Sequence, residues 1–458
     1  MSTPVHHPAS YRDPSGFIFR SEGKIYRQVN QVYKEHYDLL MTSGLYKSLT
    51  EKGLLIPHTE IAENLTEDAQ CYKTLAPELI PFISYPSEWS FGMLQDAALK
   101  TLQIQQIAMT HGMILKDATP YNLQWKDGQL IFIDTLSFEK YNETEPWIAY
   151  RQFCECFLAP LLLMHYSKQS LQAMFNAYPD GIPLQIASSL LPRRSRFSLH
   201  TYLHIHLHAN VTGKSKGIGS KKASFNATKM RNLVSSLESV VGSLKSPTAQ
   251  STWSAYYDEA SQRNDYLDQK KKIISDMLGS MKDIKNAADL GANDGAFSRL
   301  VAEQGIPVIA ADFDPNCIQR LYTEIQQQQE QRIQPLIIDL ANPTPATGLN
   351  NTERASFMQR LDTDLILALA LIHHLCIGRN IPLEDAASFF HAMGSHLLIE
   401  FVPKEDEKVR FMLQQKADIY FQYDAPHFEA AFGARFTLLS KVPVPGSPRV
   451  LYLFSRKD

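Results

Sequence analysis

The stretch Ala287-Ala288-Asp289-Leu290-Gly291-Ala292-Asn293-Asp294-Gly295-Ala296-Phe297-Ser298 decides the fold of the C-terminal half of this chain. An apolar run ends at an acidic residue, and two glycines follow within a few positions. Glycine permits positive φ angles and lets a ligand approach the backbone closely. The pattern therefore predicts a parallel strand that turns tightly into a helix through a nucleotide-binding loop.

A second buried strand is expected at residues 307–311, after a helix over residues 297–304. This strand ends at Asp312, with Asp314 just behind it. A carboxylate at the end of this strand can accept hydrogen bonds from both hydroxyls of a ribose. The sequence therefore predicts a nucleoside ligand.

The loop departs from the dinucleotide pattern, because Asn293 stands where the middle glycine would fall and the third glycine is missing. Asp289, just before the first glycine, would repel a phosphate but suits a ligand with an ammonium or sulfonium charge. These features favour S-adenosylmethionine over a pyrophosphate compound.

From this loop onward the chain resembles the class I S-adenosylmethionine-dependent methyltransferases, whose remaining motifs follow in the family's order. The resemblance implies an α/β Rossmann-like sheet with a closing antiparallel hairpin. It also implies a set of cofactor-binding residues: Asp289, Gly291, Asn293 and Gly295 for the methionine part, Asp312 for the ribose, Asp339 for the adenine amino group, and Leu340 and Leu371 beside them. More narrowly, the run from Thr352 to Pro403 is similar to a bacterial nodulation-protein-like methyltransferase group with an undefined acceptor.

The resemblance also implies the rest of the sheet. Residues 336–340 match the third strand of the family, residues 365–375 match the fourth strand with the turn that faces the acceptor, and residues 396–403 look like a fifth strand. Residues 436–442 and 449–455 flank Pro445-Gly446-Ser447-Pro448 and predict the closing hairpin.

Acceptor chemistry is expected where the fourth strand ends, because ligands lie outside the carboxyl ends of parallel strands. His373 and His374 stand there, and a histidine is the usual general base for a hydroxyl or an amine. His373 is preferred because it is nearer the strand end, although either ring can instead pack or cap the turn. Glu400 is a second candidate for catalysis, and Arg354 is a candidate for binding an anionic acceptor.

Bulk composition is that of a soluble globular protein. With 458 residues and 44% hydrophobic residues, the chain can bury a full core in two or three domains. The 45 basic and 48 acidic residues give a net charge of −3, which does not favour nucleic acid. Five cysteines are too few for a disulfide framework and favour a reducing compartment, and the N-terminus has no signal-peptide pattern. The most apolar run, at residues 157–164, is too short to span a membrane. These features predict a cytoplasmic location.

Composition changes most clearly at residues 214–224, which are small, polar and basic. We interpret them as a linker or a mobile loop, with a phosphate-contacting loop as the alternative. An N-terminal α+β domain is then expected at 1–213 and the methyltransferase domain at 225–458. The methyltransferase domain is expected to begin with helices near 229–244 and 253–278. The second of these contains four aromatic residues that either pack in the core or line the cofactor or acceptor pocket: Trp253, Tyr256, Tyr257 and Tyr266.

The N-terminal half contains a second group of candidate functional residues. An expected helix at 96–110 is followed by Asp117 and Asn122, then by a hairpin-like Lys126-Asp127-Gly128, and then by Asp134. This spacing resembles the catalytic segment of the protein-kinase-like fold, where such residues accept a hydroxyl proton and hold metal ions. A Gly-rich phosphate loop and a Val-Ala-Ile-Lys type strand are missing. A kinase-like scaffold without phosphoryl transfer is therefore preferred to an active kinase or to coincidence.

His200, His204, His206 and His208 form the histidine cluster of this sequence. Helical or extended geometry would place three of them on one face, as metal ligands require. The interleaved Tyr202, Leu203, Ile205 and Leu207 favour a half-buried element with the histidines outward. Cys154-Glu155-Cys156 lacks a partner pair at zinc spacing and is interpreted as structural.

The sequence thus predicts transfer of methyl from S-adenosylmethionine to an O or N atom of an unidentified acceptor. A small molecule or a saccharide is the first choice, and RNA or protein the second. The competing hypotheses are a two-module protein, in which the kinase-like half binds nucleotide or a partner and the methyltransferase fold is regulatory, and a cofactor-binding scaffold without catalysis.

Overall fold

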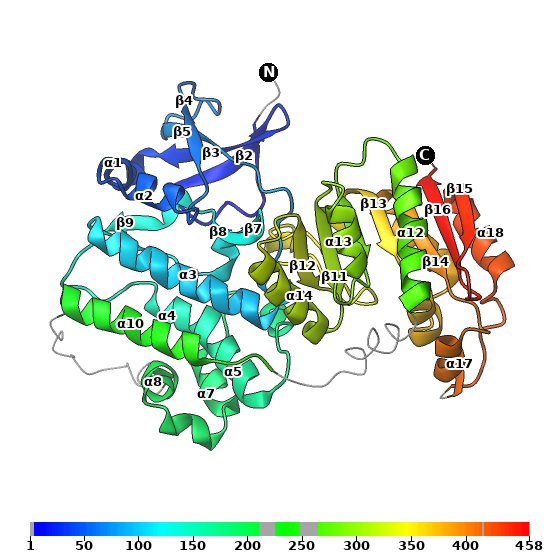
Figure 1. Cartoon of the computed structure of the whole chain (residues 1–458). Helices are drawn as coiled ribbons and strands as arrows, with labels where there is room; N and C mark the ends of the chain where they lie inside the picture. The colour runs from blue at the N-terminus through cyan, green and yellow to red at the C-terminus, as the bar shows by residue number, and fades with distance from the viewer. Residues whose placement is uncertain (1–3, 210–224, 248–263, 415, 458) are drawn as a thin grey trace. The chain divides into compact units, whose positions relative to one another are not determined.

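The chain forms two units that do not correspond to two consecutive parts of the sequence. The computed structural model describes residues 4–209, 225–247, 264–414 and 416–457. The first unit comprises residues 1–248 together with 346–354, and the second comprises 249–345 and 355–458 (Figure 1). A short piece of chain from the C-terminal half thus belongs to the first unit.

The first unit opens with a five-stranded antiparallel sheet in the order β1-β2-β3-β5-β4. Its strands are β1 (Val5–His6), β2 (Gly16–Ser21), β3 (Lys24–Asn30), β4 (His58–Ile61) and β5 (Cys71–Pro77). The turn between β2 and β3 uses Glu22 and Gly23, both at positive φ. The strands β2 and β3 therefore form a tight antiparallel hairpin.

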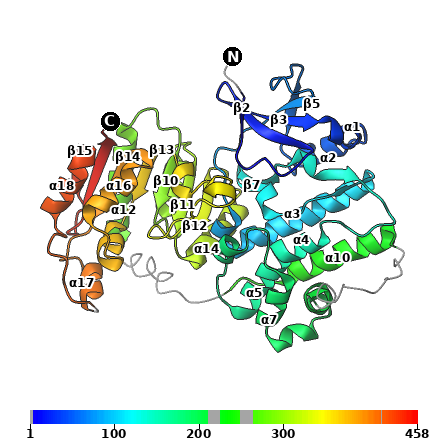
Figure 2. The ribbon, with the colours of Figure 1, turned by 180° about the vertical axis from the view of Figure 1, so that it is seen from behind.

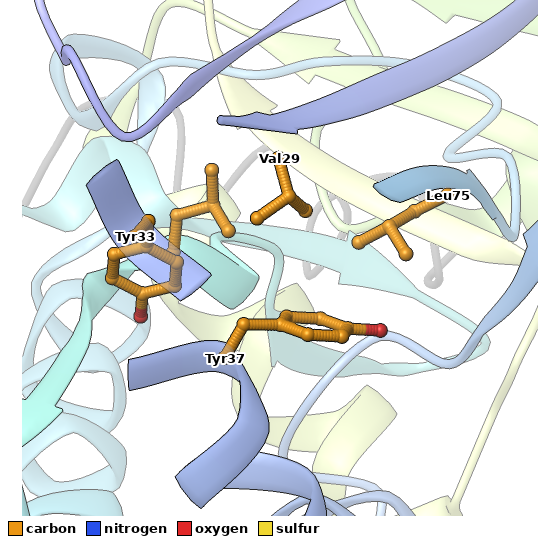
Figure 3. Close-up of a cluster of buried hydrophobic side chains, with 5 residues drawn as sticks. Val29, Tyr33, Tyr37 and Leu75 are labelled. Carbon is orange, nitrogen blue, oxygen red and sulfur yellow. The ribbon is translucent and has the colours of Figure 1, made fainter. Parts of the chain in front are cut away.

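Two helices, α1 (Lys34–Thr42) and α2 (Leu45–Glu51), follow the strand β3. A cluster of Val29, Tyr33, Tyr37, Leu75 and Leu136 is almost completely buried beside them (Figure 3). Side chains from the sheet thereby share one core with the segment after Asp134.

The long helix α3 (Phe91–Thr110) is the centre of the rest of the first unit. It begins at Ser90, whose side chain accepts a hydrogen bond from the Met93 N–H, a standard N-cap. After it come two small antiparallel pairs: β6 (Met113–Leu115) with β9 (Phe138–Lys140), and β7 (Leu123–Lys126) with β8 (Gln129–Phe132). The helix and the β7–β8 hairpin have the order expected for a kinase-like catalytic segment.

The remaining helical segments of the first unit are α4 (Tyr150–Phe153), the π-helix η5 (Cys154–Leu158), α5 (Ala159–Ser167), α6 (Met174–Ala177), α7 (Leu184–Leu190), η6 (Arg193–Phe197), α8 (Leu199–Thr201), the π-helix η7 (Tyr202–Leu207) and α10 (Ala227–Ser243). Helix α10 packs against α3, where Gln95 Nε2 donates to the carbonyl oxygens of Val241 and Leu244. From the sequence, this helix is expected in the methyltransferase domain. Its buried face, which includes Met230, Val234 and Leu237, puts it in the first unit instead.

The second unit is built on a seven-stranded sheet in the order β12-β11-β10-β13-β14-β16-β15. Its strands are β10 (Ala287–Leu290), β11 (Val308–Asp312), β12 (Ile333–Ile337), β13 (Thr363–Ala368), β14 (Gly394–Phe401), β15 (Phe436–Pro443) and β16 (Val450–Arg456). The first five are parallel, and β16 joins β14 antiparallel. The predicted sheet and its closing hairpin are confirmed.

Helices cover this sheet. Helices α12 (Asn264–Ser280) and α13 (Ala296–Ala302) lie in front of the strands in Figure 1, and α16 (Leu383–His391) does so in the reverse view of Figure 2. The others are α14 (Pro315–Gln328), α15 (Phe357–Arg360), the π-helix η9 (His374–Gly378), α17 (Glu407–Gln414) and α18 (Ala425–Arg435). This arrangement follows from strands that are apolar on both faces.

The third strand differs from its prediction. It spans Ile333–Ile337 rather than 336–340, so Asp339 lies two residues beyond its end. The strand contains Pro335, which is tolerated because β12 is at the edge of the sheet. Among the described residues, no helix has the length and apolarity needed to cross a membrane.

Candidate active site

The loop after β10 has the backbone that its glycines require. Gly291 and Gly295 adopt φ of +85° and +79°, and Asn293 between them also has positive φ. A Cβ atom at Gly295 would lie 2.7 Å from Cδ1 of Leu321, and one at Gly291 would lie 3.3 Å from Cδ1 of Leu371. The loop thus packs tightly between α14 and the segment after β13.

Two acidic residues lie at the carboxyl ends of the neighbouring strands β10 and β11. Asp312 accepts hydrogen bonds from the backbone N–H groups of Asn293 (2.9 Å) and Asp314 (2.8 Å). Asp289 is almost fully buried and accepts a 2.6 Å hydrogen bond from the Ser298 hydroxyl. The parallel pairing of the two strands brings both carboxylates to one edge of the sheet, as predicted.

Burial disfavours the ionised form of both carboxylates and so raises their pKa values. It raises the pKa of Asp312 to about 6, and it also raises the pKa of Asp289 to about 6, with a further contribution from the nearby Asp312. A cation bound beside them would restore the ionised forms, whereas a phosphate would add to the repulsion. The electrostatics of this loop therefore favour a positively charged ligand.

Asp339 lies close to the same edge, since the neighbouring Ile338 N–H donates to the Asp312 carbonyl oxygen. Its carboxylate is partly exposed and accepts a 3.0 Å hydrogen bond from Arg379. Leu340 next to it is buried. The structure thus places Asp339 and Leu340 near Asp312, and adds Arg379, which no sequence motif predicts.

The segment after β13 closes the other side of the loop. Ala370 has φ of +50°, and its N–H donates a 2.7 Å hydrogen bond to Oε2 of Glu400. Leu371 then contacts Gly291, as described above. Glu400 therefore fixes the backbone turn at Ala370, which is followed by Leu371, His373 and His374.

His373 is completely buried, and neither of its ring nitrogens has a hydrogen-bond partner. Its ring centroid lies 4.1 Å from that of His374. Burial, then the neighbouring His374, Arg449 and Lys270, lowers the pKa of His373 well below its ordinary value. Burial also lowers the pKa of His374, to about 4. Both rings are therefore neutral at pH 7.

Glu400 belongs to a buried ionic cluster that no sequence motif predicts. The Lys270 ammonium lies 2.7 Å from Glu400 Oε2, and the Tyr266 hydroxyl donates to Oε1 at 3.3 Å. Arg449 lies 3.8 Å from Glu400 and forms two hydrogen bonds to Asp406, at 2.7 and 3.1 Å. Lys270 and Arg449 hold the pKa of Glu400 below its usual value, although burial opposes them.

One signal could have revealed Lys270, because it falls four residues after Tyr266 and four before Ile274, on the buried face of α12. A charged residue in an apolar stripe requires a buried partner. Tyr266 thus lines this cluster, whereas Trp253, Tyr256 and Tyr257 lie outside the described residues.

The kinase-like constellation does come together in the first unit. Asn122 Nδ2 donates to Asp117 at 3.4 Å and to the Ser137 hydroxyl at 3.2 Å, and Ser137 in turn donates to Asp134 at 2.5 Å. Burial and the charge of Asp134 raise the pKa of Asp117. The three residues predicted for nucleotide or metal binding therefore share one site.

Asp134, however, already has a cationic partner, because it forms an ion pair with Arg27 of β3. Its carboxylate also accepts a hydrogen bond from the Leu136 N–H. The carboxylate that the sequence pattern predicts for metal binding is thus paired with a protein cation. The sequence does not single out Arg27, because the kinase-like pattern has a lysine on this strand.

This geometry makes a prediction for nucleotide binding. We expect millimolar ATP with magnesium to change the melting temperature by less than about 1 °C, because Arg27 neutralises Asp134. Differential scanning fluorimetry measures this. A rise of several degrees that disappears in Asp134→Asn would instead establish a nucleotide site in the first unit.

Arg354, a candidate for binding an anionic acceptor, lies in the first unit rather than at the edge of the methyltransferase sheet. Its guanidinium is 4.5 Å from the ring centroid of Tyr121. The neighbouring Glu353 accepts hydrogen bonds from Tyr11 at 3.0 Å and from Arg12 at 2.9 Å.

The histidine cluster is oriented opposite to its prediction. His204 and His206 point inward, and the leucines beside them are exposed. His204 bonds to Tyr150 and Ser236, His206 to Ser188 and Ser195, and His200 to Ser236, at distances of 2.7 to 2.8 Å. Across the part of the chain that the structure describes, no three His, Cys, Asp or Glu side chains are grouped as a metal site. Cys154 and Cys156 are buried free thiols.

The strand order and the loop after β10 together define the class I S-adenosylmethionine-dependent methyltransferase fold, here combined with a kinase-like unit. The chain is 32% identical over 463 residues to the nodulation protein NoeA of Rhizobium meliloti (strain 1021), covering 98% of this chain and 96% of NoeA. The chain therefore belongs to the NoeA family. No family model matches it.

Two solved structures show weaker likeness. The bifunctional kinase-methyltransferase WbdD matches 42% of this chain at 19% identity and a TM-score of 0.29, and the match spans only 39% of WbdD. The N-methyltransferase NodS from Bradyrhizobium japonicum WM9 matches 43% of this chain at 13% identity and a TM-score of 0.30, over 87% of NodS. Likeness at this level does not bear on activity or substrate.

Proposed function

We propose that the second unit transfers methyl from S-adenosylmethionine to an O or N atom of an acceptor. The observation that carries this proposal is the pair of buried carboxylates, Asp289 and Asp312, at adjacent strand ends around the glycine loop. Their raised pKa values and the positive φ at Gly291 and Gly295 fit a cationic nucleoside.

Each residue of the loop has a distinct part in holding the cofactor. Asp312 would accept hydrogen bonds from the ribose hydroxyls, and Asp339 would accept one from the adenine amino group. Asp289 and the loop backbone would hold the methionine part. Leu340 and Leu371 would contact the cofactor as apolar side chains. The bound sulfonium supplies a methyl group that is already activated. The protein's contribution is then to position the acceptor atom in line with the methyl group.

Calorimetric titration of the full chain with S-adenosylhomocysteine tests this proposal. We expect saturable one-to-one binding, and no binding of a pyrophosphate dinucleotide under the same conditions. If the dinucleotide binds and the homocysteine nucleoside does not, the methyltransferase proposal fails.

We further propose that His373 or His374 takes the acceptor proton, with His373 preferred. The unpartnered nitrogens of His373 are the supporting observation, since a buried polar atom without a partner is costly unless a ligand or water completes it. Glu400 would position the turn rather than react, because Lys270, Tyr266 and the Ala370 N–H already engage its oxygens.

The histidine proposal makes a kinetic prediction. We expect His373→Gln to lower turnover by about 100-fold, as loss of a general base does, while S-adenosylhomocysteine affinity stays within about threefold. Turnover of His374→Gln serves as the comparison. If both variants keep full turnover, neither histidine is the base.

These kinetics require the acceptor, for which a small molecule or a saccharide is the first choice and RNA or protein the second. Untargeted profiling of methylated metabolites and RNA in cells with and without the protein identifies it. Accumulation of one methylated species that depends on Asp312 would name the acceptor class.

A further inference from the structure

Residues 190–207 of the first unit include six exposed large apolar side chains. These side chains belong to α7, η6, α8 and η7, and η7 contacts the other three. Helices α7 and α8 lie at the bottom of the first unit in the view of Figure 1. Phe197 is 91% exposed, Leu199 67% and Leu190 59%. Tyr202, Leu203 and Leu207 add to the same segment. We refer to these six residues as the apolar surface.

The orientation of this segment is fixed from the inside. Its alternating pattern would let Leu203 and Leu207 pack inward, but the imidazoles of His204 and His206 occupy the interior. Each imidazole has hydrogen-bond partners on both nitrogens. Turning the leucines inward would break these bonds, so their exposure is built into the fold.

Arginines accompany the apolar surface. Arg193, Arg194 and Arg196 of η6 are all exposed, immediately before Phe197. Residues 181–209 contain no aspartate or glutamate, although acidic residues outnumber basic ones in the chain as a whole, at 48 to 45. The segment that carries the apolar surface is therefore cationic, whereas the chain as a whole is slightly anionic.

We propose that this surface binds an anionic lipid membrane. Phe197 and the exposed leucines would enter the boundary between headgroups and acyl chains, and the arginines would contact lipid phosphates, as in interfacial amphipathic segments. A second copy of the chain fits less well, because a two-fold contact through this surface would bring like-charged arginines together. The proposal is independent of methyl transfer.

Co-sedimentation of the full chain with vesicles tests the proposal. We expect binding to phosphatidylcholine vesicles that contain phosphatidylglycerol, weak binding to pure phosphatidylcholine, and loss of binding at high salt. The triple variant Arg193→Gln/Arg194→Gln/Arg196→Gln is expected to lower the partition coefficient by about 100-fold, at roughly fivefold for each arginine. Phe197→Ser is expected to lower it by about tenfold.

Matched control variants lie in the second unit. Phe421→Ser removes another highly exposed phenylalanine, and Arg332→Gln/Arg410→Gln/Arg435→Gln removes the same charge from exposed positions. Both are expected to bind vesicles like the unaltered protein. Unchanged melting temperatures show that the variants fold.

Three outcomes would overturn the proposal: no binding to either kind of vesicle at low salt, equal loss of binding in the control variants, or concentration-dependent self-association that Phe197→Ser abolishes without vesicle binding. The last outcome would assign the surface to a second copy of the chain.

Discussion

Glu400→Gln is expected to destabilise the second unit by about 3–5 kcal/mol, because it leaves the buried Lys270 ammonium without a counter-charge. Glutamine keeps the size of the side chain, so the change isolates the charge. Hydrogen exchange of the β13 and β14 amides measures the effect locally and does not require two-state unfolding of the whole chain. An increase of about 100-fold or more in exchange rate is expected in both strands.

The ion pair Lys441–Glu429 provides a matched control. Its atoms are 2.6 Å apart, against 2.7 Å for Lys270–Glu400, but its side chains are about 40% exposed rather than buried. Glu429→Gln should therefore cost no more than about 1 kcal/mol. Equal costs for the two substitutions would show that burial does not govern the strength of the Glu400 pair.

A double-mutant cycle separates the charge from the packing. Lys270→Met alone should be destabilising, because it removes the main partner of Glu400. The double variant Lys270→Met/Glu400→Gln should recover part of this stability. Additive losses would contradict a direct interaction between the two side chains.

Asp312→Ala is expected to weaken S-adenosylhomocysteine binding by about 100-fold, since it removes a charged acceptor of the ribose hydroxyls. Asp312→Asn keeps the shape and should lose a similar amount. Full affinity in Asp312→Ala would contradict the ribose assignment even if the nucleoside still binds.

The pH dependence of this affinity provides a second readout. The free Asp312 carboxyl has a pKa of about 6, and the ribose needs its ionised form. Affinity should therefore be constant above about pH 7 and fall as pH decreases through 6, by up to about tenfold per pH unit for one carboxylate. Asp312→Asn should make this profile shallower. Asp364→Asn, near the opposite end of β13, should leave it unchanged.

Glycine spacing and the order of the methyltransferase motifs were enough to predict the sheet of the second unit and the loop between β10 and α13. The parallel strands there contain short apolar runs, and Asp289, Asp312 and Glu400 lie at or next to the last residue of their strands. The third strand was misplaced because its Pro335 argues against a strand unless that strand is known to lie at the sheet edge.

The parts that could not be predicted depend on pairs of residues distant in the sequence. Lys270 and Glu400 are 130 residues apart, and Arg27 and Asp134 are 107 apart. No local pattern indicates such a partner. The direction of the histidines in η7 was also predicted wrongly, because serine and tyrosine hydroxyls from other segments, rather than local hydropathy, decide which side is buried.

The short segment 346–354 has a consequence for how this protein can be divided. It is encoded between β12 and β13, yet its Glu353 accepts hydrogen bonds from Tyr11 and Arg12 in the first unit. A fragment that ended at residue 248 would lack the Glu353 carboxylate. A fragment that began at residue 249 would contain segment 346–354 without Tyr11 and Arg12, which donate hydrogen bonds to it. A cut of the chain at residue 248 therefore separates the Glu353 carboxylate from the two side chains that donate hydrogen bonds to it.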